Sequence, residues 1–295
     1  MVGEMVVTSA VDGMETLGVG CPMWAHRPWV GRFYPAGIRP GEELAHYASW
    51  CNAVEGNTTF YAEPSASTIA AWGEQTDAGF RFLFKLPRTI THEKRLRDVA
   101  VEVRSFLDRV APLGERLGPL QVQLPPSFGP DDLDALGAFL RRLPSDFGWA
   151  LEVRHRSYFD GSAPHRRLDD WCQQRGIARV ILDARCVHAA RDQAPATIEE
   201  QRNKPNLPVL VESAGSHPVV RVIGEQRPDV TMDALRAWVP QVVHWLEEGR
   251  TPHVFVHQPD NVDSPGLARA FHEAVRAERS AVAPLPDPIG QAPLF

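Results

Sequence analysis

The stretch PLQVQLPPSFGPDDLDALGAFLRRLPSDFGWALEV, residues 119–153, contains two short apolar runs on either side of one amphipathic segment. The runs Pro119–Leu124 and Trp149–Val153 have the length of buried parallel strands, whose alternation is weak because both faces are covered. The apolar positions that share one helical face between them are Leu133, Leu136, Phe139, Leu140 and Leu143. Pro130-Asp131-Asp132 places acids in the first turn, where the helix dipole favours them. The stretch therefore predicts a strand–helix–strand unit.

The same alternation continues through the rest of the chain. Six further apolar runs have the length of strands: Leu17–Cys21, Ala53–Asn57, Arg81–Leu86, Arg179–Asp183, Val219–Ile223 and His253–His257. Eight strands with helices between them, over about 265 residues, predict a single-domain α/β fold, a (β/α)8 or TIM barrel. A doubly wound sheet is the alternative, because periodicity does not reveal closure. The absence of a glycine-rich phosphate fingerprint after the first strand disfavours its dinucleotide-binding form.

Several helix boundaries carry local signals. Leu235, Trp238, Val242 and Trp245 predict one helix, for which Thr231 is a plausible N-cap residue. Leu168, Trp171 and Cys172 predict a shorter helix, which Gly176 would end because glycine readily adopts the left-handed conformation. We expect these helices to cover the barrel.

Composition indicates a soluble protein of ordinary type. The 295 residues are 43% hydrophobic and carry a net charge of −6, so the surface as a whole does not attract nucleic acid. The four dispersed cysteines, Cys21, Cys51, Cys172 and Cys186, argue against a disulfide framework or a thiolate zinc site. No apolar run approaches the roughly 20 residues that span a bilayer, and no signal peptide is evident. We expect a cytoplasmic protein without membrane contact.

The two ends of the chain differ from its centre. Residues 1–16 are expected to form an acidic, disordered leader, residues 17–279 the barrel domain, and residues 280–295 a Pro/Ala-rich tail. The tail ends in QAPLF, which resembles the Gln-x-x-Leu-Phe motif with which bacterial replication and repair proteins bind the DNA polymerase sliding clamp. Gln291, Leu294 and Phe295 would make that contact. Alternatively, the tail folds under the barrel and caps its underside.

Polar side chains concentrate where the predicted strands end. Active sites of such barrels form at the C-terminal ends of the strands. Ionisable groups in a buried register are costly unless they are paired, so their concentration at one end predicts a site. The candidate catalytic residues are Glu55, Lys85, Glu152, His92, Asp183 and His257. The candidate substrate-binding residues are Trp24, His26, Asn57, Tyr61, Arg88, Gln123, Arg154, His155, Arg185 and Arg221.

Some of these positions have structural alternatives. Glu55 and Lys85 could form only a structural ion pair, and Asp183 could cap the next turn. Gln121 and Gln123 flank Val122, and we expect Gln123 in the mouth and the other glutamine outward. Trp24 and Trp29, in the first loop, are candidates for a wall of the pocket.

The residue types admit three chemistries. Of Glu55 and Glu152, one could act as the general acid and the other as the general base, as in a glycosidase. The acids and histidines (Glu55, His92, Glu152, Asp183 and His257) could instead bind a divalent metal for phosphodiester hydrolysis. Five cations, Lys85, Arg88, Arg154, Arg185 and Arg221, fit an anionic substrate such as a phosphate.

These chemistries define two classes of function. We expect a hydrolase of a small phosphorylated substrate or of a nucleic-acid end. The alternative is a non-catalytic interaction protein held on the sliding clamp by its tail.

Several stretches resemble the YecE-like family, which contains domain of unknown function 72. They are Trp24-Ala25-His26 with Trp29, NAVEGNTTFY at residues 52–61, FRFLFK at 80–85, TITH at 89–92, QLPPSF at 123–128, EVRH at 152–155, VILD at 180–183 and HQPD at 257–260. The likeness runs from about Leu17 to His272 and implies a TIM-type barrel in a bacterial cytosolic protein, but no particular reaction. The sequence departs from commoner members at His257 and at Ile223-Gly224. Because both departures lie at the predicted mouth, the substrate is expected to differ across the family.

Overall fold

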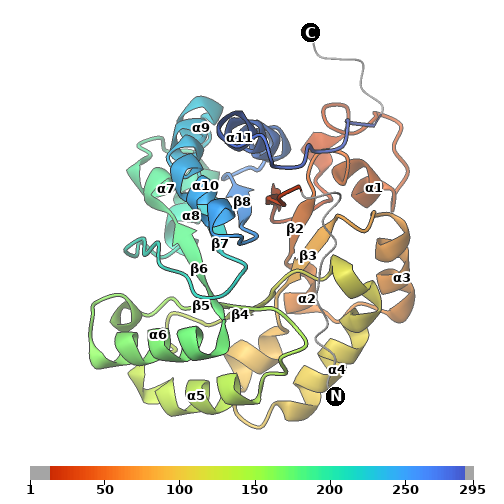
Figure 1. Cartoon of the computed structure of the whole chain (residues 1–295). Coiled ribbons are helices and arrows are strands. Elements are labelled where there is room, and N and C mark those ends of the chain that lie inside the picture. Colours follow the sequence, from red (N-terminus) through yellow and green to blue (C-terminus); the bar gives the residue numbers. More distant parts are fainter. Residues whose placement is uncertain (1–13, 290–295) are drawn as a thin grey trace.

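The computed structural model describes residues 14–289, in which eight strands and the helices between them form a barrel (Figure 1). The strands are β1 (Gly18–Cys21), β2 (Ala53–Gly56), β3 (Arg81–Phe84), β4 (Leu120–Gln123), β5 (Trp149–Glu152), β6 (Ala178–Asp183), β7 (Val219–Ile223) and β8 (His253–His257). Before β3 lie the helices α1 (Glu43–Tyr47), α2 (Thr58–Tyr61) and α3 (Ala66–Glu74). After β3, β4 and β5 come, respectively, α4 (Ala100–Val110), α5 (Leu133–Arg142) and α6 (Ala163–Arg175). The β6–β7 connection contains α7 (Arg185–Ala189) and α8 (Pro195–Asn203), after which come α9 (Pro228–Arg236), α10 (Val239–Glu247) and α11 (Ser264–Glu278).

The strand order shows that the sheet closes on itself. Neighbouring strands pair in parallel in the order β3-β2-β1-β8-β7-β6-β5-β4. The two end strands, β3 and β4, meet through the isolated bridges Phe82–Leu117 and Lys85–Gln121. Across this seam the Leu86 amide donates to the Gln121 carbonyl at 2.9 Å. An open, doubly wound sheet has no bond between its edge strands, so the predicted single-domain barrel is confirmed.

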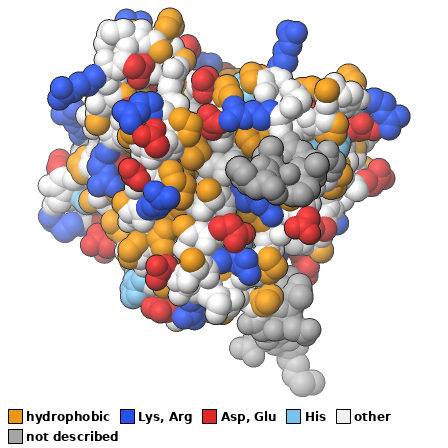
Figure 2. All heavy atoms as spheres, turned by 90° about the horizontal axis from the view of Figure 1, so that it is seen from above, with side chains coloured by type: hydrophobic (Ala, Val, Ile, Leu, Met, Phe, Trp, Pro, Cys, Tyr) orange, Lys and Arg blue, Asp and Glu red, His pale blue; other side chains and the backbone are white. Residues whose placement is uncertain are grey.

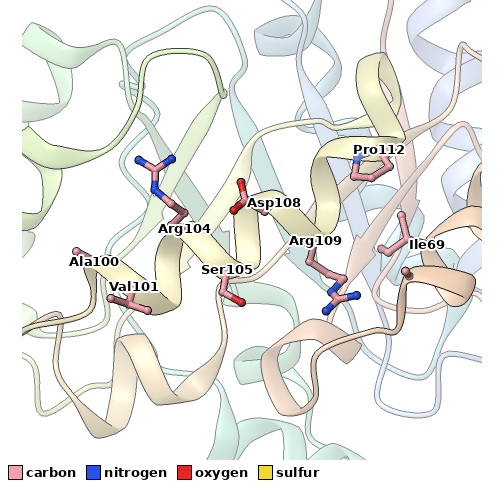
Figure 3. A pocket seen from close by; sticks show the side chains of 9 residues that line it. Ile69, Ala100, Val101, Arg104, Ser105, Asp108, Arg109 and Pro112 are labelled. Carbon is pink, nitrogen blue, oxygen red and sulfur yellow. The ribbon is translucent and has the colours of Figure 1, made fainter.

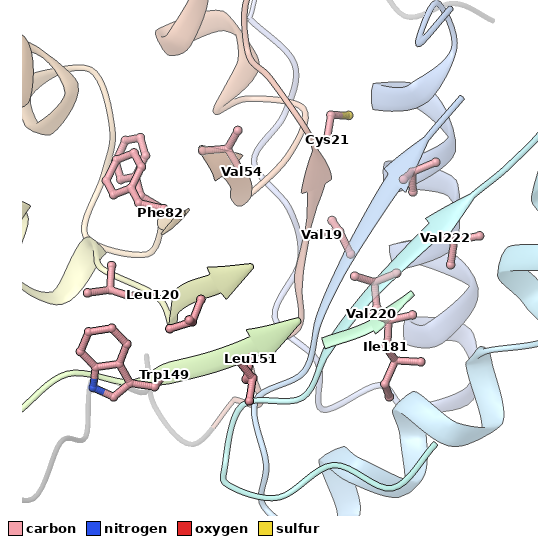
Figure 4. Packing of buried hydrophobic residues seen from close by; sticks show 14 of the residues in the cluster. Val19, Cys21, Val54, Phe82, Leu120, Trp149, Leu151, Ile181, Val220 and Val222 are labelled. Carbon is pink, nitrogen blue, oxygen red and sulfur yellow. The ribbon is translucent and has the colours of Figure 1, made fainter. Parts of the chain in front are cut away.

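Each strand has two different faces. The outward side chains, among them Val19, Val54, Leu151, Val220 and Val222, pack in the main hydrophobic core beneath the helices (Figure 4). The inward side chains of the lower half form a separate apolar cluster: Ala53, Leu83, Ala150, Ala178, Val180, Val219 and Phe255. Successive side chains of a strand point to opposite faces, so residues two positions further along these strands also face inward.

Two helix boundaries test the local signals. Gly176 follows α6 with φ 60°, which confirms it as the residue that ends this helix. The expectation for Thr231 is wrong, because α9 begins at Pro228 and Thr231 lies inside it. Its hydroxyl instead donates to the carbonyl of Glu225 at 2.9 Å, so it fixes the loop after β7.

Both described ends of the chain contact the barrel. The Glu15 amide donates to the Ala281 carbonyl, and the Ala283 amide donates to the Glu15 carbonyl. Val282 and Leu285 are buried. Residues 280–289 therefore pack against the body rather than forming a free tether, whereas residues 290–295, including the QAPLF peptide, lie outside the described residues. No helix within residues 14–289 combines the length and apolar character needed to cross a membrane.

Candidate functional site

Ionisable side chains fill the upper half of the barrel interior. Glu55 follows Ala53 by two residues on β2, and Glu152 follows Ala150 in the same way on β5, so both face inward. The corresponding positions after Leu83, Val219 and Phe255 are Lys85, Arg221 and His257. All five are buried, with at most 5% of their surface exposed. Barrel closure thus brings together four of the six predicted catalytic residues and one predicted binding residue.

Arg221 lies at the centre of this cluster. Its Nη1 donates to Oε2 of Glu152 at 2.7 Å, and its Nε lies 2.8 Å from Oε1 of Glu55. One guanidinium therefore joins two carboxylates that come from β2 and β5. We call the six residues connected in this way the charge network: Glu55, Lys85, Glu152, Arg154, Arg221 and His257.

Glu55 contacts three members of the charge network. Lys85 Nζ lies 3.1 Å from its Oε1, and His257 Nε2 lies 3.0 Å from its Oε2. Neither oxygen of Glu55 has a partner with hydrogen-bond geometry within residues 14–289. The carboxylate is therefore held mainly by the surrounding charges. The predicted Glu55–Lys85 pair exists, but it is one contact in a larger assembly.

Arg154 is the network member nearest to solvent. Its Nε donates to Oε1 of Glu152 at 2.6 Å, and 14% of its side chain is exposed. Within residues 14–289 its two terminal nitrogens have no hydrogen-bond partner. With Arg154 included, three cations face two carboxylates, which leaves one net positive charge in the barrel.

The charge states follow from burial and from these neighbours. Burial alone would raise the pKa of Glu152, but Arg154 and Arg221 lower it to about 2. Burial likewise opposes the ionisation of Glu55, yet Arg221 and Lys85 hold its pKa well below the usual range. Burial, reinforced by Arg221, lowers the pKa of Lys85 to about 8 and that of His257 to about 3. At neutral pH both carboxyls are ionised, His257 is neutral, and Lys85 titrates nearest to pH 7.

His92 lies at the rim beside this network. It sits in a single π-helical turn, Thr89–Glu93, after β3, and its ring packs edge-on against Phe60 with centroids 5.0 Å apart. Burial, followed by the charges of Arg154 and Arg88, lowers the pKa of His92 to about 4. The imidazole is therefore uncharged at neutral pH and experiences a positive local potential.

The loop that follows His92 has an unusual backbone. Arg95, Leu96 and Asp98 all have positive φ, a conformation that non-glycine residues rarely adopt. Asp132, before α5, holds this loop by accepting hydrogen bonds from Arg95 and, at 3.0 Å, from Arg97. Although burial opposes it, these two arginines lower the pKa of Asp132. Strained backbone of this kind clusters at functional sites, and sequence reasoning did not identify Asp132.

Lys204 is a second residue that sequence reasoning missed. It directly follows α8, in the long connection between β6 and β7. Burial, followed by Arg221, lowers the pKa of Lys204, and Glu55 and Arg154 also act on it, so it lies close to the charge network. Its Nζ is 3.5 Å from Glu200. The sequence contains three lysines, Lys85, Lys94 and Lys204, and two of them therefore lie at this site.

The expectation for the two glutamines of β4 needs correction. Gln121 and Gln123 are two residues apart and share the inward face, whereas Val122 between them packs in the outer core. Gln121 pairs in register with Ala150, and Gln123 pairs with Glu152. Both side chains are therefore beside the charge network.

Several predicted site residues lie outside the network. Asp183 faces away from the barrel interior, where it accepts hydrogen bonds from Arg185 and, at 2.9 Å, from Trp238. Asp183 and Arg185 are therefore not part of the charge network. Arg88 is largely exposed and lies 3.7 Å from Glu93. Of the five predicted cations, only Lys85, Arg154 and Arg221 meet.

The residues of the first loop mostly stabilise the fold. Trp24 packs against Trp72 and Phe82, and Trp29 is fully buried and donates to the Asn261 carbonyl at 2.8 Å. Trp29 is therefore a core residue, and Trp24 is a partly buried residue packed against the core. The remaining predicted binding residues also have local partners: His26 packs on Trp29, Asn57 donates to the Pro22 carbonyl, His155 bonds to Ser157, and the exposed Tyr61 packs against Phe60.

The predicted metal ligands do not assemble as a set. Glu55 and His257 are in contact, but Asp183 faces away from the interior. Within residues 14–289, no three His, Cys, Asp or Glu side chains come together in a way that could hold a metal ion.

The outer surface offers less specific features. A pocket of about 660 Å³ lies between α3 and α4, lined by Ile69, Val101 and Arg104 among others (Figure 3). On the face seen in Figure 2, acidic and basic side chains are interspersed with apolar ones and form no large patch of one sign.

Comparisons with known proteins agree with this architecture. The family model described as "Protein of unknown function DUF72" matches residues 18–291. The chain is 38% identical over 277 residues to the UPF0759 protein YecE of Escherichia coli K12 and to that of Escherichia coli O157:H7; each match covers 94% of this chain and 99% of the relative.

Solved structures show the same fold at lower identity. A DUF72 family protein from Enterococcus faecalis V583 superposes with a TM-score of 0.63 at 18% identity, covering 91% of this chain and 99% of that one. A DUF72 family protein from Thermotoga maritima MSB8 gives 0.62 at 20% identity, covering 90% and 99%.

Proposed function

This chain belongs to the DUF72 family, and we propose that it is a barrel enzyme that binds a small anionic substrate at the C-terminal rim. The reaction we propose is hydrolysis of a phosphorylated or nucleic-acid-derived compound. The observation that carries the proposal is the net positive charge enclosed in the barrel of a protein whose total charge is −6. Buried charge attracts an oppositely charged ligand more strongly than surface charge, because water screens it less.

Three titratable groups respond to the positive electrostatic potential at this site. The pKa values of His92, Lys85 and Lys204 are all lowered, first by burial and then by a neighbouring arginine. A phosphate or carboxylate among these groups would relieve the repulsion between them. Arg154 is suited to bind it, since its terminal nitrogens lack a partner within residues 14–289 and a guanidinium can bind a phosphate through two parallel hydrogen bonds.

Two groups have protonation states suited to hydrolysis of a phosphate ester. Water would add to phosphorus while the bond from phosphorus to the leaving oxygen breaks. Lys85, with a pKa of about 8, is mostly protonated at neutral pH and would give a proton to that oxygen. His92, with a pKa of about 4, is uncharged and would accept the proton from water. Glu55 and Glu152 would keep the cations in place.

The other chemistries receive less support from the same geometry. A glycosidase needs one carboxyl whose pKa is raised so that it can act as the acid. Here the pKa of Glu152 is about 2, and that of Glu55 is also far below its usual range. The proposed divalent metal would lack a ready set of ligands, because Asp183 faces away from the other four candidates.

Titration with inorganic phosphate tests the binding half of this proposal. We expect the wild-type protein to bind phosphate and Arg154→Gln to bind it at least about tenfold more weakly, as for the loss of a charged hydrogen bond. Arg156→Gln, at an exposed arginine two residues away, is the matched control and should bind like wild type. No phosphate binding between pH 6 and 8, or equal losses in both variants, would contradict the proposal.

Release of phosphate from a panel of phosphomonoesters tests the catalytic half. Lys85→Met should abolish turnover, and circular dichroism should show that the variant is folded. Full activity in this variant would remove Lys85 from the mechanism.

We also propose, independently, that the QAPLF peptide binds the DNA polymerase sliding clamp. Supporting this, the described chain ends at the surface, where Ile289 is 55% exposed and its amide donates to Ser49 at 3.0 Å. Deleting residues 291–295 should abolish binding to purified clamp in a surface plasmon resonance assay. Unchanged binding, or none by the full chain, would refute the proposal.

A further inference from the structure

Two buried glutamines in the barrel have side-chain atoms without partners. Gln121 is fully buried, and neither its Oε1 nor its Nε2 has a hydrogen-bond partner within residues 14–289. Gln123 is 8% exposed, and its Oε1 is buried and unpartnered as well. These three atoms are on one strand, β4, and on the inward face.

Such groups are costly in the interior of a barrel. Burying an amide without a hydrogen bond disfavours folding, and interior positions of a parallel barrel are ordinarily filled by Val, Ile or Leu. The Gln121 side chain lies at the level of Lys85 and Ala150, and Gln123 lies at the level of Glu152. The unsatisfied amides therefore adjoin the charge network that we propose as the anion site.

The chemistry of an amide indicates what would satisfy it. The ionised members of the charge network can each only donate or only accept: Lys85, Arg154 and Arg221 donate, and Glu55 and Glu152 accept. A glutamine offers both a donor and an acceptor and carries no charge. A hydroxyl group has the same dual character, so adjacent hydroxyls of a sugar or polyol would match the two glutamines.

We propose that Gln121 and Gln123 form a hydroxyl-binding subsite, so that the substrate is a phosphorylated sugar or polyol. This inference rests on the proposed function, because it assigns the neutral end of the same anionic ligand. A nucleobase edge also donates and accepts, but base recognition commonly adds an aromatic ring for stacking. Of the two aromatic candidates in the first loop, Trp29 is fully buried in the core, and the ring of Trp24 is engaged with Trp72 and Phe82. This favours hydroxyls over a base.

Calorimetric titration with three probes separates these ligands. Inorganic phosphate tests the anion site alone, ribose 5-phosphate adds hydroxyls, and adenosine 5′-monophosphate adds a base. The wild-type protein should bind ribose 5-phosphate about tenfold more tightly than phosphate, the difference expected for one or two additional hydrogen bonds. Gln121→Met preserves side-chain volume without the amide and should erase this difference while leaving phosphate affinity unchanged. Gln174→Met, at an exposed glutamine of α6, is the control.

The melting temperature of the ligand-free protein provides a second readout. If the Gln121 amide lacks a partner until substrate binds, Gln121→Met should raise the melting temperature while it weakens sugar phosphate binding. A lower melting temperature would mean that the amide has a structural partner such as an ordered water, and the inference would fall.

The outcomes distinguish this inference from the proposed function. A wild-type protein that binds none of the probes refutes both. Binding of phosphate without any preference for ribose 5-phosphate refutes only the hydroxyl subsite. Tighter binding of the nucleotide with no gain from ribose 5-phosphate would replace hydroxyls by a base. Retention of the preference for ribose 5-phosphate in Gln121→Met would also overturn the assignment.

Discussion

Removing the charge of Glu55 should destabilise the protein far more than removing the charge of Lys85. Glu55 is fully buried and lies within 3.1 Å of Lys85, Arg221 and His257. The network holds three cations and two carboxylates, so Glu55→Gln raises its net charge from +1 to +2. Lys85→Met instead lowers the net charge from +1 to zero. Because uncompensated buried charge is what costs stability, the two variants should differ although they disrupt the same contact.

The size of the loss in the free energy of unfolding follows from the number of contacts and the pKa of Lys85. Removing one partner of a buried ion pair typically costs about 3–5 kcal/mol. Here we expect a loss at the lower end of this range, because Lys85 can release its proton and so reduce the uncompensated charge. With a pKa of about 8, that release costs only about 1.4 kcal/mol at pH 7. We therefore expect Glu55→Gln to lower the free energy of unfolding by about 3 kcal/mol, and Lys85→Met by less than about 1.5 kcal/mol.

The double variant provides the decisive comparison. Glu55→Gln/Lys85→Met restores a net charge of +1 and should be more stable than Glu55→Gln alone. The coupling energy should be at least about 1 kcal/mol, within the range found for contacting residues. Urea denaturation followed by circular dichroism at pH 7 measures all four proteins. The exposed Lys94–Glu102 pair is the matched control, and its cycle should show no measurable coupling.

Two results would refute this reasoning. Equal losses in Glu55→Gln and Lys85→Met would show that contacts, rather than net charge, determine the stability of the network. Additive losses in the double variant would show that the two residues act independently. In either case the enclosed positive charge would no longer support an anion site.

Three further predictions concern titration and the rim loop. In an NMR pH titration of protein with ¹³C-labelled lysine side chains, one of the three lysine signals should titrate with a midpoint near pH 8. That signal should be absent from Lys85→Met. Titration midpoints above pH 10 for all three lysines would contradict the assignment. Burial lowers the pKa values of His253, His257 and His272, so these side chains are neutral in the folded protein. In the unfolded chain a histidine has a pKa of about 6.5, so below that pH the unfolded chain binds more protons than the folded protein. The free energy of unfolding should therefore fall as pH drops from 6.5 to 4.5, by up to about 1.4 kcal/mol per pH unit per histidine, and urea denaturation giving a flat profile would oppose this. Asp132→Asn should release the loop at Arg95 and Arg97 and accelerate tryptic cleavage there, whereas Asp131→Asn, at its exposed neighbour, should not.

Local patterns in the sequence were sufficient for the architecture. The apolar runs of residues 119–124 and 149–153 became β4 and β5, and the helical face between them became α5. Such patterns succeed because burial imposes a period of two or 3.6 residues wherever a strand or helix covers a core. The prediction that Gly176 ends α6 was correct for a similar reason, since the left-handed conformation is a property of one residue. The prediction that Thr231 is an N-cap residue was wrong because α9 begins three residues earlier, at Pro228.

The sequence by itself determined the barrel, the family and the residue types available at the strand ends. Only the tertiary structure decided which of them meet: Glu55, Lys85, Glu152, Arg154, Arg221 and His257 converge, whereas Asp183 and Arg185 face away. It also brought Lys204 and the unpartnered amide of Gln121 beside them. The reason is that Coulomb energies and hydrogen bonds depend on distances between atoms. Those distances are fixed when eight strands far apart in the chain close into one ring.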